Sequence, residues 1–132
     1  MNNICGIELK SDNAILTVVD QDQNLVKTGK ISLKDSYDSD IIKDFTTKIN
    51  QFFIDNNVVI CCIKKRMEKG KFAGGPITFK IEGLIQYIFE KKVCFCSTPE
   101  VNKVQKNISY PDGIKKYMEN AFAAAVFCNQ NI

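Results

Sequence analysis

The sequence contains no histidine among its 132 residues. This absence excludes serine–histidine and cysteine–histidine nucleophiles, imidazole general bases and imidazole metal ligands. Any chemistry must therefore depend on carboxylates, lysines, thiols or a metal ion that carboxylates hold.

Long apolar runs are also missing. None approaches the roughly 18 residues that span a bilayer, and the N-terminus lacks the basic region and apolar stretch of a signal peptide. Hydrophobic residues make up 45% of the chain and charged residues 25%, which is ordinary for a globular protein. We expect one domain, residues 1–132, that is cytoplasmic and has no membrane partner.

The six cysteines do not follow a disulfide or zinc pattern. Five lie inside apolar runs, and Cys128 lies in a helical pattern near the C-terminus. Cys94 and Cys96 are separated by a single residue, whereas zinc sites typically use Cys-x-x-Cys pairs. Free thiols that pack as small apolar side chains are therefore expected.

Positive charge is concentrated in one short segment, residues 64–75. It holds five of the 18 basic residues and one of the 15 acidic ones, so the rest of the chain carries 13 bases against 14 acids. A glycine-containing cationic loop ahead of a helix predicts contact with anions, above all phosphates. The candidate nucleic-acid-binding residues are Lys64, Lys65, Arg66, Lys69, Lys71, Phe72, Gly74 and Gly75.

Three interpretations of this segment remain open. Phe72 lies among the lysines, where an aromatic ring could stack on an unpaired base, or it could anchor the loop to the core. Charge runs are also commonly just solvated surface.

The hydrophobic pattern predicts the element order βββ-α-β-α-β-α. Strands are expected at residues 4–9, 14–19, 25–33, 58–63 and 93–96, and helices at about 41–53, 76–88 and 113–128. The third strand is the most polar and belongs near an edge, whereas the unalternating run 58–63 suits a strand covered on both faces. A five-stranded mixed sheet with helices on both faces follows, in the order of the ribonuclease H-like α/β fold.

Several segments resemble known proteins. Residues 4–8, 98–104 and 120–125 resemble the first strand, a post-strand segment and the last helix of RuvC-type Holliday-junction resolvases. The chain as a whole resembles an uncharacterised bacterial family known as a domain of unknown function. The residues that carry this second resemblance are 5–10, 69–75 and 79–82.

The resolvase resemblance implies a metal-dependent nuclease. Such enzymes hold one or two divalent ions with about four carboxylates, and the ions activate water and stabilise the leaving oxygen. It therefore implies Glu8 and Glu119 as catalytic residues and metal ligands, with Mg²⁺ or Mn²⁺ as the ion. Glu82 or Asp112 could complete the cluster.

The sequence departs from this pattern at two positions. Lys65 stands where the related family carries a glutamate, and Asn120 stands where the last helix of the resolvases carries an acid. At about 100° per residue, Glu119 and Asn120 cannot both face the same centre. Glu8 itself could instead lie at an exposed strand end or pair with Lys65.

Three functional hypotheses follow. The first is a nucleic-acid-binding protein, a degraded or atypical relative of the metal-dependent nucleases. The second is an active Mg²⁺- or Mn²⁺-dependent nuclease that uses Glu8 and Glu119. The third is a non-enzymatic protein-interaction or regulatory module. A homodimer is one oligomeric state to test.

Overall fold

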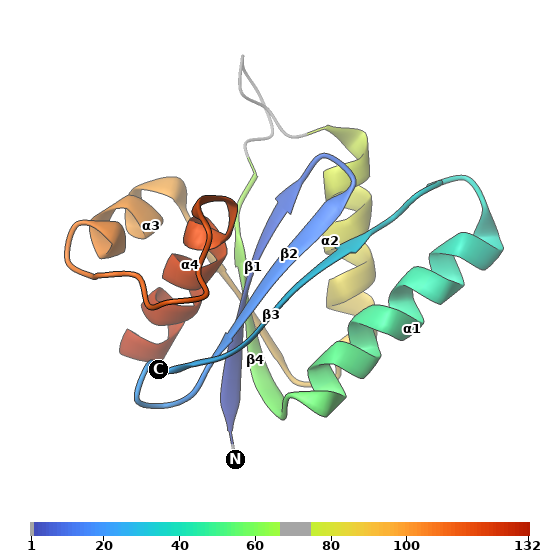
Figure 1. Cartoon of the computed structure of the whole chain (residues 1–132). Coiled ribbons are helices and arrows are strands. Elements are labelled where there is room, and N and C mark those ends of the chain that lie inside the picture. The colour runs from blue at the N-terminus through green and yellow to red at the C-terminus, as the bar shows by residue number, and fades with distance from the viewer. Residues whose placement is uncertain (1, 67–74) are drawn as a thin grey trace.

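Five strands form a single mixed sheet in the order β3-β2-β1-β4-β5 (Figure 1). The computed structural model describes residues 2–66 and 75–132. The strands are β1 (Asn3–Lys10), β2 (Asn13–Val19), β3 (Leu25–Ser32), β4 (Val58–Lys64) and β5 (Lys92–Cys96). The helices are α1 (Ser39–Asp55), α2 (Pro76–Ile88), α3 (Thr98–Gln105) and α4 (Glu119–Gln130), with a short 3-10 helix, η1 (Lys116–Met118), before α4.

The strand directions place the C-terminal ends of β1, β4 and β5 at the same end of the sheet. β1 pairs with β2, and β2 with β3, in antiparallel fashion. β1 and β4 are parallel, as are β4 and β5. The expected order of the strands and of α1, α2 and α4 is confirmed, with one additional helix, α3, between β5 and α4. The edge position of the polar third strand is also confirmed.

Local sequence signals account for where most helices begin. The Asp38 carboxylate accepts hydrogen bonds from the N–H groups of residues 40 and 41 and so caps α1. Ser97 and Glu100 form a capping box at the start of α3. Pro76 occupies the first turn of α2, where its missing N–H leaves no hydrogen bond unmade.

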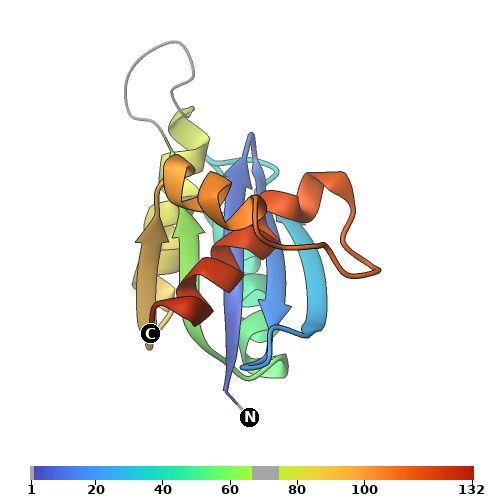
Figure 2. The ribbon, with the colours of Figure 1, turned by 90° about the vertical axis from the view of Figure 1, so that its left-hand side faces the viewer.

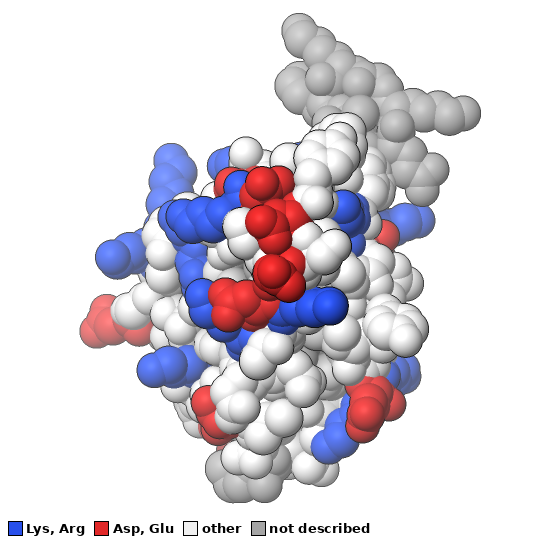
Figure 3. Space-filling view, turned by 90° about the vertical axis from the view of Figure 1, so that its right-hand side faces the viewer, with Lys and Arg blue, Asp and Glu red and all other residues white. Residues whose placement is uncertain are grey.

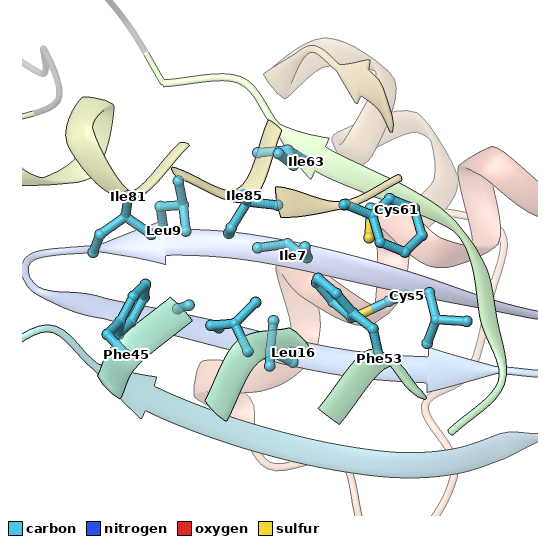
Figure 4. Close-up of a cluster of buried hydrophobic side chains, with 14 of the residues drawn as sticks. Cys5, Ile7, Leu9, Leu16, Phe45, Phe53, Cys61, Ile63, Ile81 and Ile85 are labelled. Atoms are coloured by element: carbon cyan, nitrogen blue, oxygen red, sulfur yellow. The ribbon is translucent and has the colours of Figure 1, made fainter. Parts of the chain in front are cut away.

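Helices cover both faces of the sheet (Figures 1 and 2). α1 and α2 pack on one face through a cluster of buried isoleucine, leucine and phenylalanine side chains, several of which Figure 4 shows. α3 and α4 pack on the other face, where the buried residues are mainly alanine, cysteine and valine. The middle strand, β1, contributes side chains to both clusters.

The helices differ from the expectation in two places. The last helix begins at Glu119 rather than near residue 113, because Gly113 adopts φ +97° and the 3-10 turn of η1 intervenes. Residues 98–105 form an additional helix of eight residues, α3.

The cysteines behave largely as expected. All six are free, and five are buried. Burial raises the pKa of the Cys5 and Cys61 thiols, which keeps them protonated.

Among the described helices, none combines the length and apolarity that crossing a membrane would need.

Candidate functional site

The Glu8 carboxylate lies at the end of β1, on the face that α4 covers. Side chains alternate between the two faces of a strand, and Ile4 and Gly6 of the same set contact α4. Glu8 is only 6% exposed. Because burying a carboxylate without partners costs several kcal/mol or more, the surrounding groups must compensate for its charge.

Two groups face one oxygen of this carboxylate. Asn120 Nδ2, from α4, donates a hydrogen bond of 2.8 Å to Glu8 Oε2. Lys64 Nζ, from the end of β4, lies 4.0 Å from the same oxygen, and the Lys64 side chain is 12% exposed. The site therefore joins the ends of two parallel strands to the first turn of a helix on their shared face.

The amide of Asn120 is itself oriented by α3. Gln105 Nε2 donates a hydrogen bond of 2.9 Å to Asn120 Oδ1, so the NH₂ group of Asn120 is directed towards Glu8. Tyr110 adjoins this chain: burial raises its pKa, and a hydrogen bond from Gln105 opposes that shift. A continuous polar chain thus runs from Lys64 through Glu8 and Asn120 to Gln105.

Gly6 explains how α4 comes close enough to complete this chain. A Cβ atom on Gly6 would lie 1.9 Å from the carbonyl oxygen of Ala121 and 2.5 Å from the backbone nitrogen of Ala125. The α4 backbone therefore rests almost directly on β1, which only glycine allows. The alanines at 121 and 123–125 are fully buried and keep the helix near the sheet.

The structure corrects the predicted cation partner of Glu8. The ammonium beside Glu8 belongs to Lys64, whereas the side chain of Lys65 is exposed. The backbone N–H of Lys65 donates a hydrogen bond of 2.8 Å to the carbonyl of Cys96. Neighbouring residues of a strand point to opposite faces, so the Lys65 side chain leaves the face on which Glu8 lies.

The other predicted carboxylates do not join Glu8 in a described cluster. Asn120, and not Glu119, forms the hydrogen bond to Glu8, so Glu119 as a ligand or catalytic residue stays a prediction. Glu82 belongs to α2, which packs on the opposite face of the sheet, and Asp112 lies exposed in the loop before η1. Within residues 2–66 and 75–132, no three acidic or cysteine side chains are grouped so that they could hold a metal ion.

Only part of the predicted basic segment can be placed. Lys64, Lys65, Arg66 and Gly75 are described, whereas Lys69, Lys71, Phe72 and Gly74 lie outside the described residues. Gly75 precedes α2 as its N-cap, with φ −75° and no side-chain hydrogen bond to the helix. Within residues 2–66 and 76–132, apart from its chain neighbour, no atom lies within 4 Å of where the Cβ of Gly75 would be.

Sequence reasoning missed Gln105 and the role of Asn120 as a hydrogen-bond donor. No spacing rule links an amide on one helix to an amide on another. The available signal for Asn120 was its position beside the alanine-rich stretch that packs on β1.

Solved structures with a similar fold include Holliday-junction resolvases. Thermus thermophilus RuvC superposes with a TM-score of 0.74 at 8% identity, covering 95% of this chain and 92% of that one. T. thermophilus RuvC in complex with a Holliday junction substrate gives 0.70 at 9% identity, covering 96% and 92%. Fowlpox virus resolvase with Holliday junction DNA gives 0.51 at 12% identity, covering 98% and 99%. The chain therefore has the ribonuclease H-like fold of RuvC.

The family is established by sequence. The family model described as "Protein of unknown function (DUF3010)" matches residues 1–128. The chain belongs to this family. Among curated proteins, none matches the chain.

Proposed function

We propose that this protein binds nucleic acid through phosphate contacts at the ends of β1 and β4, as an atypical relative of the RuvC-type nucleases. The observation that carries the proposal is the position of the basic residues that follow β4. Lys64 lies beside Glu8, and the basic run continues directly from there into residues 65 and 66.

The backbone of Lys65, the first basic residue after β4, is held in place by a hydrogen bond to β5. The Lys65 N–H donates to the carbonyl of Cys96, next to the last pair of β4 with β5, Lys64 with Cys96, while the Lys65 side chain remains exposed. Its charge is therefore available to an anion that approaches this end of the sheet.

Arg66 adds a second indication. Its Nε atom is buried and, in the described part of the chain, has no hydrogen-bond partner. A buried donor without an acceptor costs free energy, and a phosphate oxygen is a good acceptor for a guanidinium group. None of the described residues crowds Gly75 beyond its own chain neighbour, and no side chain caps the start of α2; both features fit an approaching nucleic-acid phosphate.

The fold relatives are consistent with this ligand class. Two of the matching structures, T. thermophilus RuvC and fowlpox virus resolvase, contain Holliday junction DNA. By contrast, the basic and acidic side chains of the described residues are interspersed on the α1 side of this protein (Figure 3).

Salt dependence of binding tests the proposal. Each phosphate contact contributes roughly 0.7 to 0.9 to the slope of log K against log salt. Replacing Lys65, Lys69 and Lys71 by alanine should therefore reduce that slope by about 2 to 3 on single-stranded, duplex and four-way-junction DNA. A fluorescence anisotropy titration at several salt concentrations measures it.

A matched variant controls for net charge. Lys27, Lys91 and Lys92 are exposed and lie at the opposite end of the sheet, near the starts of β3 and β5. Replacing these three by alanine removes the same charge and should leave the slope nearly unchanged. Equal slopes for both variants and the wild type would refute the proposal and favour the protein-interaction hypothesis.

The active-nuclease hypothesis is separated by a cleavage assay. The wild-type protein and the Glu8→Ala variant are each incubated with branched, single-stranded and RNA–DNA hybrid substrates in the presence of Mn²⁺. We expect no cleavage product that the wild type forms and the variant does not. Cleavage that disappears in Glu8→Ala would establish the nuclease in place of the binding protein.

A further inference from the structure

The Glu8 site contains positive groups where a divalent ion would need anionic ones. Mg²⁺ and Mn²⁺ prefer sites built from several oxygen ligands, carboxylates above all. The described neighbours of Glu8 Oε2 are instead the NH₂ group of Asn120 at 2.8 Å and the ammonium of Lys64 at 4.0 Å. The residues present therefore do not fit the metal that the fold family implies.

The orientation of the Asn120 amide also disfavours a metal ion at Glu8, and a neighbouring residue fixes that orientation. An asparagine amide could in principle turn its oxygen towards a metal ion. Here the Gln105 amide donates to that oxygen at 2.9 Å, which directs the donor side of Asn120 at the carboxylate. Residues from β4, α4 and α3 thus cooperate to hold Glu8 with positive and donor groups.

We infer that Lys64 is the permanent counter-cation of Glu8 and occupies the role of the divalent ion, so that this site functions without metal. If the protein binds nucleic acid as proposed above, a phosphate at this site would meet the ammonium group of Lys64 and not a metal ion. Lys64 and Asn120 are the two residues that keep the metal out.

Replacing Lys64 and Asn120 by acidic residues should turn the site into one that binds a divalent cation. Lys64→Glu combined with Asn120→Asp would bring together three carboxylates, from β4, α4 and β1, at the position where Glu8 is now compensated. Like charges at such distances repel, and a divalent cation relieves the repulsion.

A Mn²⁺ titration without nucleic acid tests the inference, with free Mn²⁺ followed by electron paramagnetic resonance. The wild type should show no saturable Mn²⁺ site that depends on Glu8. The double variant Lys64→Glu/Asn120→Asp should bind Mn²⁺ with an affinity at least tenfold above any binding that the wild type shows. Lys27→Glu with Asn102→Asp makes the same charge change at two exposed positions and should bind no better than the wild type.

Two outcomes would overturn the inference. One is saturable Mn²⁺ binding by the wild type that is lost in Glu8→Gln. The other is a folded double variant that binds no more tightly than the exposed control. Should the double variant fail to fold by circular dichroism, Lys64→Gln with Asn120→Asp is titrated, and it must still bind Mn²⁺ more tightly than the control. Because no nucleic acid is present, the result does not depend on whether the protein binds DNA or RNA.

Discussion

The two faces of the sheet are built on different principles. The α1/α2 face is filled by large side chains such as Phe45, Phe53 and Ile81, all almost fully buried. The α3/α4 face is filled mainly by valine, alanine and cysteine, and its alanines let the α4 backbone approach β1. That close approach brings Asn120 to Glu8. One face thus supplies mainly apolar burial, and the other also holds a buried charge in place.

Glycine substitutions should separate the two faces most strongly. Gly6→Ala forces a Cβ into the α4 backbone, so the helix must move and Asn120 must withdraw from Glu8. Overpacking of this kind usually costs about 1–3 kcal/mol, and because the obstacle is backbone we expect a loss of more than about 3 kcal/mol. Urea unfolding measures this loss as a change in the free energy of unfolding.

Gly83→Ala on α2 is the matched control. Outside the adjoining backbone of α2, no atom of the described residues lies within 4 Å of the Cβ that it would add, and alanine is the better helix former. It should raise the free energy of unfolding by about 0.5–1 kcal/mol. Similar effects at both positions would contradict the close packing of α4 on β1.

The buried ion pair should give the next largest effect. Lys64→Met leaves the carboxylate of Glu8 buried without its cation, and the 4.0 Å separation indicates a moderate interaction. We expect a loss of about 2 kcal/mol in the free energy of unfolding, again measured by urea unfolding.

The double variant Glu8→Gln/Lys64→Met tests whether charge is the cause. It removes both charges and keeps a side-chain oxygen for Asn120, so it should recover most of the lost stability. A double variant that is as unstable as the sum of its single variants would show that the two charges are not coupled.

Helix capping should affect both faces equally. Asp38→Ala removes the cap of α1 and Ser97→Ala removes that of α3. Each should cost about 1 kcal/mol, measured by urea unfolding. A much larger effect of Ser97→Ala would mean that α3 depends on its cap to hold Gln105 against Asn120.

The smallest effect concerns pH on the α3 side. Hydrogen bonds from Ser97 lower the pKa of Glu100 below its ordinary value of 4.5. A carboxyl whose folded-state pKa is lowered contributes stability above its unfolded pKa and loses it as pH falls through the folded value. Glu100→Gln should therefore reduce the decline in thermal stability below pH 4.5. An unchanged decline would exclude Glu100 as a contributor.

Much of the fold could be predicted from the sequence because its signals are local. The apolar runs fix the strands, and Asp38, Ser97 and Pro76 mark helix starts. The late start of α4 was missed because the 3-10 turn interrupts a pattern that continues on both sides of it.

The candidate site was only partly predictable. A carboxylate on an otherwise apolar strand identified Glu8, but its partner lies one residue from the expected Lys65, and a shift of one residue in a strand reverses the face. The contact of Gln105 with Asn120 depends on how two helices pack, which no local pattern encodes.

The most direct measurement is a crystal structure from crystals soaked in MnCl₂, with anomalous scattering to locate the ion. We predict no manganese peak at the Glu8 carboxylate and the Lys64 ammonium still beside it. A manganese ion bound to Glu8, with Lys64 displaced, would contradict a site in which lysine takes the place of the metal.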